Sequence, residues 1–155
     1  MVSLVLVLLL LSLALGVNPT PLAPVPGVAL DTTRHRFGSY DAPVTPEMID
    51  GEVHLLATPR DYVDWMASLP ADLRPIVGNA VDPTFDGHFL VASTQWWCAQ
   101  TTSLRYDQGG HGLIYHVHEE PDVDCAAAPG LEVFTVADAD VGDDPATLTV
   151  VTYSS

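Results

Sequence analysis

The pattern of apolar positions predicts one helix, over residues 58–69. Four apolar side chains recur at the i, i+3, i+4 and i+7 spacing of a single helix face: Tyr62, Trp65, Met66 and Leu69. Thr58 suits the N-cap and Pro59 the first helical position, and Pro70 ends the pattern. Because the stripe is continuous and apolar, we expect it to pack against the core of the protein.

Short runs of alternating or continuous apolar residues predict strands along the rest of the chain. The expected strands are 53–57, 88–95, 97–107, 112–119, 131–137 and 147–153. Residues 108–111, Gln-Gly-Gly-His, have the composition of a hairpin turn. No helical pattern is expected after residue 75. The fold class is therefore mainly β with one early helix (α+β), arranged as an antiparallel β-sandwich or a small open barrel.

The first 17 residues form an apolar run that, as a helix, is shorter than the hydrocarbon core of a bilayer. We interpret residues 1–16 as a signal peptide cleaved after Gly16, residues 17–29 as a proline-rich spacer and residues 30–155 as a single globular domain. The run contains no Lys or Arg, so an uncleaved N-terminal anchor is the alternative. No later apolar run reaches the length of a membrane span, and the expected location is secreted or otherwise extracytoplasmic.

The charge balance excludes nucleic acid as a partner. The 155 residues carry 20 acidic and 5 basic side chains, for a net charge of −15, and such a surface repels phosphate. Lysine is absent, and aspartate outnumbers glutamate by 15 to 5. This bias resembles that of halophilic proteins, whose carboxylates stay hydrated in concentrated salt. A genome rich in G and C, which replaces Lys by Arg, is the competing explanation.

Cys98 and Cys125 are the two cysteines of the chain. In an exported protein an even pair indicates a disulfide, and closing this loop would stabilise the fold by roughly 3 kcal/mol. A catalytic cysteine is the alternative, but it would need a nearby histidine and a reducing environment.

Two groups of residues could form a site. His116 and His118 share one face of an expected strand and could bind a metal with Glu120, Asp122 or His88 as a third ligand; otherwise both face solvent. Trp96 and Trp97 point to opposite faces of a strand. If one is exposed, it is a candidate contact for a partner protein or a sugar ring.

Four segments carry a resemblance to a known family. They are TPRDYVDWMASL, DPTFDGHFLVAS, GLIYHVHEEPDVDCAAAP and LEVFTVADADV, in that order. The arrangement resembles the C-terminal domain of the protease complex subunit PrcB over about residues 53–141. The glycine pair of the family's hairpin is replaced here by Trp96-Trp97-Cys98. The resemblance implies a small secreted accessory domain that binds or stabilises another protein, without catalytic residues.

Three classes of function follow from these patterns. The first is a non-catalytic exported accessory domain that binds another exported protein, with no cofactor. The second is an extracytoplasmic metal-binding domain built on His116 and His118. The third is a secreted hydrolase of unrecognised type, which the lack of a nucleophile–base motif, a P-loop or a dinucleotide fingerprint makes the weakest.

Overall fold

A computed structural model describes residues 24–38, 42–98, 100–120 and 124–155. These residues form two four-stranded sheets, two α-helices and three short 3-10 helices. The strands are β1 (Val28–Ala29), β2 (Thr32–Gly38), β3 (Val53–Leu56), β4 (His88–Trp97), β5 (Gln100–Asp107), β6 (Gly112–Glu119), β7 (Ala128–Ala137) and β8 (Thr149–Ser154). The helices are η1 (Pro46–Met48), α2 (Pro59–Ser68), α3 (Arg74–Ala80), η2 (Asp138–Asp140) and η3 (Pro145–Thr147).

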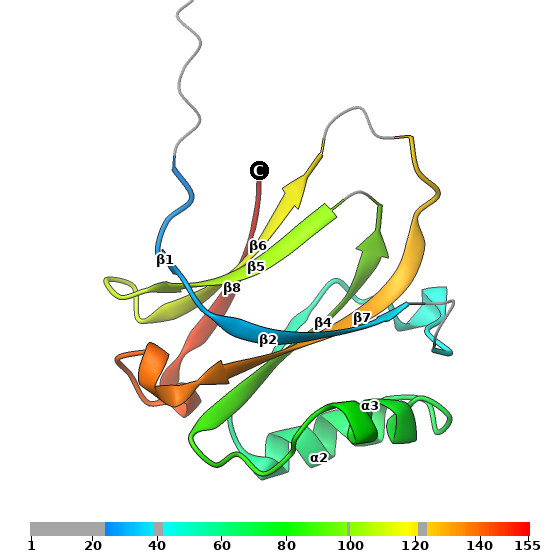
Figure 1. Cartoon of the computed structure of the whole chain (residues 1–155), viewed down its shortest axis with the longest axis horizontal. Helices are drawn as coiled ribbons and strands as arrows, with labels where there is room; N and C mark the ends of the chain where they lie inside the picture. Colours follow the sequence, from blue (N-terminus) through cyan, green and yellow to red (C-terminus); the bar gives the residue numbers. More distant parts are fainter. Residues whose placement is uncertain (1–23, 39–41, 99, 121–123) are drawn as a thin grey trace, which may run out of the picture.

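The elements stack in three layers (Figure 1). The sheet with strand order β2-β7-β4-β3 lies in the middle, the sheet with order β1-β5-β6-β8 covers one of its faces, and α2 and α3 cover the other. The neighbouring strands pair antiparallel except β6 and β8, which are parallel. The expected α+β fold, built from two open sheets packed as a sandwich, is thus confirmed.

Each face of the middle sheet packs into its own hydrophobic cluster, because alternate side chains of a strand point to opposite faces. On β4, Leu90 and Ala92 pack with the helices, whereas Phe89 and Val91 pack against the other sheet. The inter-sheet cluster also includes residues of other strands, among them Leu104, Tyr106, Leu113, Tyr115 and Phe134. The sandwich therefore has a continuous apolar layer on both sides of β4 and β7.

Helix α2 forms as the sequence predicts. The Thr58 hydroxyl accepts a hydrogen bond from the Asp61 backbone N–H at 3.2 Å, and the Asp61 carboxylate accepts one from the Thr58 N–H at 2.9 Å, which completes a capping box. Tyr62 and Trp65 are buried against the sheet, as is Leu69 just past the helix. The predicted turn at 108–111 also forms, between β5 and β6.

Other sequence expectations were wrong or incomplete. A second helix, α3, begins at Arg74 with Pro75 in its first turn; its seven residues are too few to show a helical period. Strands β1 and β2 were not expected, because Thr32–Gly38 is almost entirely polar. Trp97 ends β4 and does not begin the next strand, and β6 pairs with β8 in parallel although an antiparallel system was expected.

One side of the sandwich is closed and the other is open. The short segment between β1 and β2 carries the chain from one sheet directly into the other, so these neighbouring edges are covalently linked. On the opposite side the edge strands are β3 and β8, and no ladder joins them among the described residues. This open side is where the candidate site lies.

The expected signal peptide, 1–16, and most of the expected spacer, 17–29, fall outside the described residues. Within the described ranges, neither helix has the length and apolar composition needed to cross a bilayer.

Candidate functional site at the open end of the sandwich

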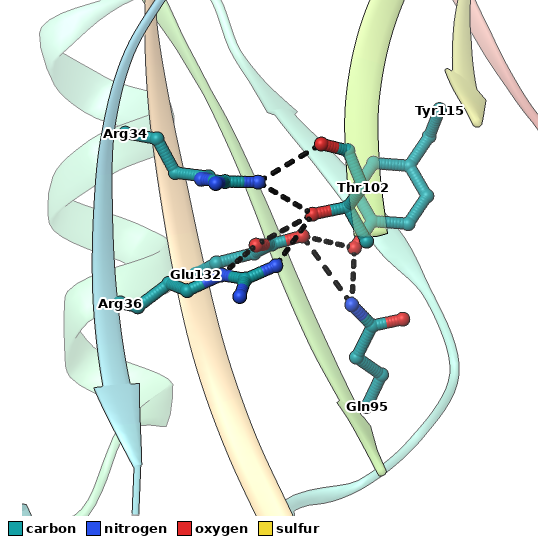
Figure 2. Close-up of polar contacts among 6 residues, drawn as sticks. All are labelled: Arg34, Arg36, Gln95, Thr102, Tyr115 and Glu132. Carbon is teal, nitrogen blue, oxygen red and sulfur yellow. Dashed lines mark hydrogen bonds and ion pairs between the residues drawn. The ribbon is translucent and has the colours of Figure 1, made fainter. Parts of the chain in front are cut away.

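A buried carboxylate, Glu132 of β7, organises the space between the two sheets (Figure 2). Its side chain is fully buried and accepts hydrogen bonds at both oxygens. The donors are Arg36 Nε at 3.2 Å, the Thr102 hydroxyl at 2.9 Å, the Gln95 amide at 3.3 Å and the Tyr115 hydroxyl. Five strands therefore meet at one carboxylate, and each of its oxygens has two donors.

The network extends to both sides of the sandwich. On the β2 side, Arg34 Nη1 donates to the Thr102 carbonyl at 2.9 Å, and both arginines donate to the Thr102 hydroxyl. On the open side, the Gln95 amide donates to the Tyr115 hydroxyl at 2.6 Å. The arginine side chains are partly exposed, at 37% for Arg36, so the buried negative charge is neutralised from the surface.

This arrangement is suited to holding side chains in place. The Thr102 hydroxyl gives its proton to Glu132 and accepts from two arginines, so it is not free to act as a nucleophile. Burial, followed by the charge of Glu132, raises the pKa of Tyr115 far above its usual value. Tyr115 therefore stays protonated and keeps Gln95 oriented toward the open side.

Trp97 lies half-buried at the end of this network, on the face of β4 that faces the other sheet. The Arg36 guanidinium lies 5.1 Å from its ring centroid, in a cation–π contact. The ring covers Gly130 closely: a Cβ atom on this glycine would lie 2.4 Å from the ring. The indole nitrogen is buried without a hydrogen-bond partner among the described atoms.

A cleft of about 320 Å³ opens beside the network, between the two sheets. Its walls come from the region before β3, the end of β4 and the ends of β6 and β8. The residues that carry its chemistry are Gln95, Trp96, Tyr115, Glu119, Thr152 and Ser154. Trp96 is 44% exposed, so of the two tryptophans it is the one available to a partner.

The structure brings His116 and His118 side by side on the outer face of β6. Their ring centroids are 6.3 Å apart, and the Ser155 hydroxyl lies 2.8 Å from His116 Nε2 and 3.5 Å from His118 Nδ1. Burial, followed by the charge of His118, lowers the pKa of His116. Leu113, Tyr115 and Val117 on the same strand are buried. The two histidines therefore lie on the more exposed face, opposite the core.

Among the described residues, neither Glu120 nor His88 joins this pair to form a metal-ligand group, and Asp122 lies outside the described residues. His88 lies at the start of β4, stacked on Phe85. The three-residue group with metal-ligand spacing in the described part of the chain is elsewhere: Asp50, Glu52 and His54, with donor atoms within 4.8 Å of one another. Within this group, His54 Nε2 lies 3.5 Å from the Asp50 carboxylate, and the Glu52 N–H donates to Asp50 Oδ1 at 2.9 Å, so contacts between the three residues account for their closeness.

The disulfide between Cys98 and Cys125 is present, with the Cα atoms 5.7 Å apart. It links the residue after β4 to the segment before β7, directly beside Trp97, whose Cα partner in the ladder is Ala128. The disulfide therefore ties together the two strands that carry Gln95, Trp96 and Glu132.

Sequence reasoning did not identify the buried network. Glu132 was a detectable signal, because it is the one charged residue in an apolar strand and shares a face with Phe134 and Val136. Arg34 and Arg36, spaced to share one strand face, were the matching signal. Their partnership could not be seen without the pairing of β2 with β7, which is a long-range contact.

Comparisons with family models, curated proteins and solved structures found no match to the chain, so the resemblance to the PrcB C-terminal domain stays a prediction.

Proposed function

We propose that the protein is a non-catalytic exported accessory domain that binds another exported protein through the cleft at the open end of its sandwich. The observation that carries this proposal is the position of Trp96. Trp96 lines the cleft, and its side chain, 44% exposed, lies on the face of β4 that also carries Leu90 and Ala92, at the rim of the cleft. A large exposed aromatic side chain of this kind often dominates a protein interface.

The rigidity of the surrounding structure supports a recognition role. Trp96 lies on a strand that is paired over its full length with β7, next to the disulfide. The neighbouring Gln95 is held by Tyr115 and Glu132. A side chain fixed before binding loses less conformational entropy in the complex, which favours affinity.

The chemistry of the network favours binding over turnover. The hydroxyl protons of Thr102 and Tyr115 are donated to Glu132, and that carboxylate is saturated with donors. A hydrolase needs a nucleophile with a free base beside it and a group that stabilises the developing charge. In the buried network the Thr102 hydroxyl has no free base beside it, and the arginines that could stabilise charge already bond Glu132 and Thr102.

Partner capture with a matched pair of variants tests the proposal. The mature domain is crosslinked in the protein's own culture medium, and the captured proteins are identified by mass spectrometry. Trp96→Ala should reduce capture of a specific partner at least tenfold. Val63→Ala removes an apolar side chain that is 62% exposed on α2 and should leave capture unchanged. Both variants should melt within a few degrees of the wild type.

Two results would contradict the proposal. One is the absence of any partner whose capture depends on Trp96. The other is a hydrolytic activity of the domain that disappears when a histidine is replaced.

Export is a separate part of the proposal. The disulfide is compatible with an oxidising, extracytoplasmic location. Intact-mass analysis of the exported protein should show a chain that begins at Val17. Retention of residues 1–16 would indicate the N-terminal anchor instead.

A further inference from the structure

The end of β4 lacks a neighbour on one side. β4 pairs with β7 over all ten residues, His88–Trp97, but its pairing with β3 stops at the Val53–Ser93 pair. Thr94 is reached by the Asp50 side chain, through a 2.8 Å hydrogen bond. Beyond it, no described strand covers the edge of β4 on this side. Among the described residues, 95–97 therefore have no ladder partner on this side and form a short free edge. The loop before β3 reaches as far as Thr94, whose hydroxyl accepts a hydrogen bond from the Asp50 N–H at 3.4 Å.

A free edge exposes backbone hydrogen-bonding groups in alternation. In an antiparallel pair, every second residue directs its N–H and C=O toward the partner, and the residues between direct theirs away. Since β7 pairs with one side of β4, alternate residues in 95–97 direct these groups to the uncovered side. Such groups are a template for another strand unless they are blocked.

The cleft lies along this free edge and is large enough to receive side chains. It has a volume of about 320 Å³, and its lining includes Gln95 and Trp96 on β4 and Gly51 and Val53 at the start of β3. An added strand in line with β3 would run past Trp96. Its side chains would enter the space in front of Tyr115 and Val117 on the other sheet.

The opposite wall adds hydrogen-bond acceptors. Just after β8, the Ser155 N–H donates to the Val117 carbonyl at 3.1 Å, and the Ser155 carbonyl accepts from the Glu119 N–H at 3.1 Å. Ser155 therefore directs both backbone groups toward β6. By the alternation of a parallel ladder, Thr152 and Ser154, which line the cleft, direct their carbonyls away from β6.

The charge of the cleft selects the sign of its occupant. Glu119 lines the cleft, and Asp50 and Glu52 flank the lining residue Gly51. No basic residue is among the lining residues described. In a chain with a net charge of −15, a positively charged occupant is favoured, and a second copy of the same chain is disfavoured by repulsion.

We propose that an extended, positively charged segment of the partner adds as a strand to the free edge of β4 at residues 95–97, with its side chains in the cleft beside Trp96 and Glu119. This inference rests on the proposed function and names the partner's binding element. Backbone pairing supplies affinity in such complexes, and the pockets for alternate side chains supply specificity.

To test the inference, a library of random linear ten-residue peptides is displayed on phage and selected against the mature domain at 0.1 M KCl. At this salt concentration the Debye length is about 10 Å, so charge still contributes to binding. The selected peptides should combine β-branched or aromatic residues with Arg or Lys. The tightest peptide is then synthesised in three forms: unmodified, and N-methylated on either alternate set of backbone amides. One N-methylated form should bind at least tenfold more weakly, because its amides face β4, and the other should bind like the unmodified peptide.

Hydrogen exchange locates the peptide. Backbone amides in 95–97 should become protected on binding, and Glu119→Gln should weaken binding several-fold without changing the melting temperature.

Equal binding by all three peptide forms, selection of acidic peptides, or recovery of no binder would each overturn the inference. A captured partner that requires Trp96 but leaves 95–97 unprotected would refute strand addition while the proposed function stands. A peptide that binds as expected, with no partner captured, would refute the function instead.

Discussion

The contact between Gly130 and Trp97 makes a residue-scale prediction. A Cβ atom at position 130 would lie 2.4 Å from the indole ring, far inside van der Waals contact, so Gly130→Ala must displace Trp97 from its seat under Arg36. We expect the free energy of unfolding to fall by about 1–3 kcal/mol, the usual cost of overpacking. Urea unfolding followed by tryptophan fluorescence measures the loss.

Gly38 provides the matched control, because it is the ladder partner of Gly130 and contacts the same ring. Its added Cβ would lie 3.6 Å from the indole, which is an ordinary contact. Gly38→Ala should therefore be neutral or stabilise by up to about 1 kcal/mol through a less flexible unfolded chain. Equal losses of stability for the two variants would show that the close packing of Trp97 on Gly130 does not limit the side chain at position 130.

Glu132 makes the second prediction at this scale. Glu132→Leu leaves the hydroxyls of Thr102 and Tyr115 and the amide of Gln95 without their acceptor, so we expect a loss of about 3 kcal/mol or more. Glu132→Gln keeps the shape and one acceptor oxygen, and about half that loss is expected. Urea unfolding at pH 7 compares the loss of stability in the leucine variant with that in the glutamine variant. A leucine variant as stable as the wild type would mean that the donors find other partners.

At the scale of elements, one carboxylate ties the β7–β8 connection to the β5–β6 hairpin. Asp143 accepts a hydrogen bond from the Tyr106 hydroxyl at 2.5 Å and lies 3.0 Å from His111 Nδ1. The bond from Tyr106, followed by that from His111, lowers the pKa of Asp143 below its usual value. This carboxylate therefore stabilises the fold above the unfolded-state pKa of about 4, and the contribution disappears as pH falls through the lower folded-state pKa.

Asp143→Asn should accordingly lower the melting temperature at pH 7, and the difference from the wild type should shrink toward zero by about pH 2. Asp72→Asn changes an exposed carboxylate that has no hydrogen-bond or ion-pair partner among the described residues, and it should have little effect at either pH. Circular dichroism melts across this range test the prediction. A difference that persists undiminished at pH 2 would assign the role of Asp143 to packing.

Strand β6 carries the histidine pair, and its metal affinity should be weak. Two imidazoles whose ring centroids are 6.3 Å apart offer two ligands, whereas protein zinc sites use at least three protein ligands. Calorimetric titration with Zn²⁺ should therefore show no site tighter than about micromolar. Replacing His54 or His116 by alanine shows whether any zinc binding comes from the group around His54 or from the histidine pair. Tight binding that is lost with His116→Ala would favour the metal-binding alternative over the accessory domain.

The sequence predicts the elements whose signals are local. The capped helix α2 and the hairpin at 108–111 follow from residues within a dozen positions of one another. The sequence does not predict strand β2, because its side chains are mostly polar and fit a strand only when Arg36 pairs with Glu132 of β7. The cleft is not predicted either, because its walls come from residues about 100 positions apart in sequence, such as Val53 and Thr152. Trp96 could be predicted as a candidate contact, but which tryptophan is exposed depends on where β4 ends.

For the whole molecule, the distribution of charge matters more than any single pair. The two basic residues of the network, Arg34 and Arg36, are committed to Glu132 and Thr102. Arg105 and Arg74 bond backbone carbonyls, and Arg60 pairs with Asp64 at 3.7 Å. The five arginines are therefore occupied within the fold, and most of the described carboxylates are exposed and have no arginine partner. Self-repulsion then opposes the compact state at low salt.

Salt should stabilise this protein strongly. At about 0.1 M salt the Debye length is about 10 Å, and above about 1 M it is 3 Å or less, so repulsion between exposed carboxylates is screened. We expect the melting temperature to rise by more than about ten degrees between 0.1 M and 3 M KCl, because a few kcal/mol shift the unfolding midpoint of a domain of this size by about this much. A variant that carries Asp72→Asn, Asp124→Asn and Asp140→Asn, all at exposed positions, has a smaller net charge. It should start from a higher melting temperature at low salt and gain less from KCl. If the wild type and this variant respond equally, the gain comes from salting-out of apolar surface, and the acidic composition is better explained by the base content of the genome.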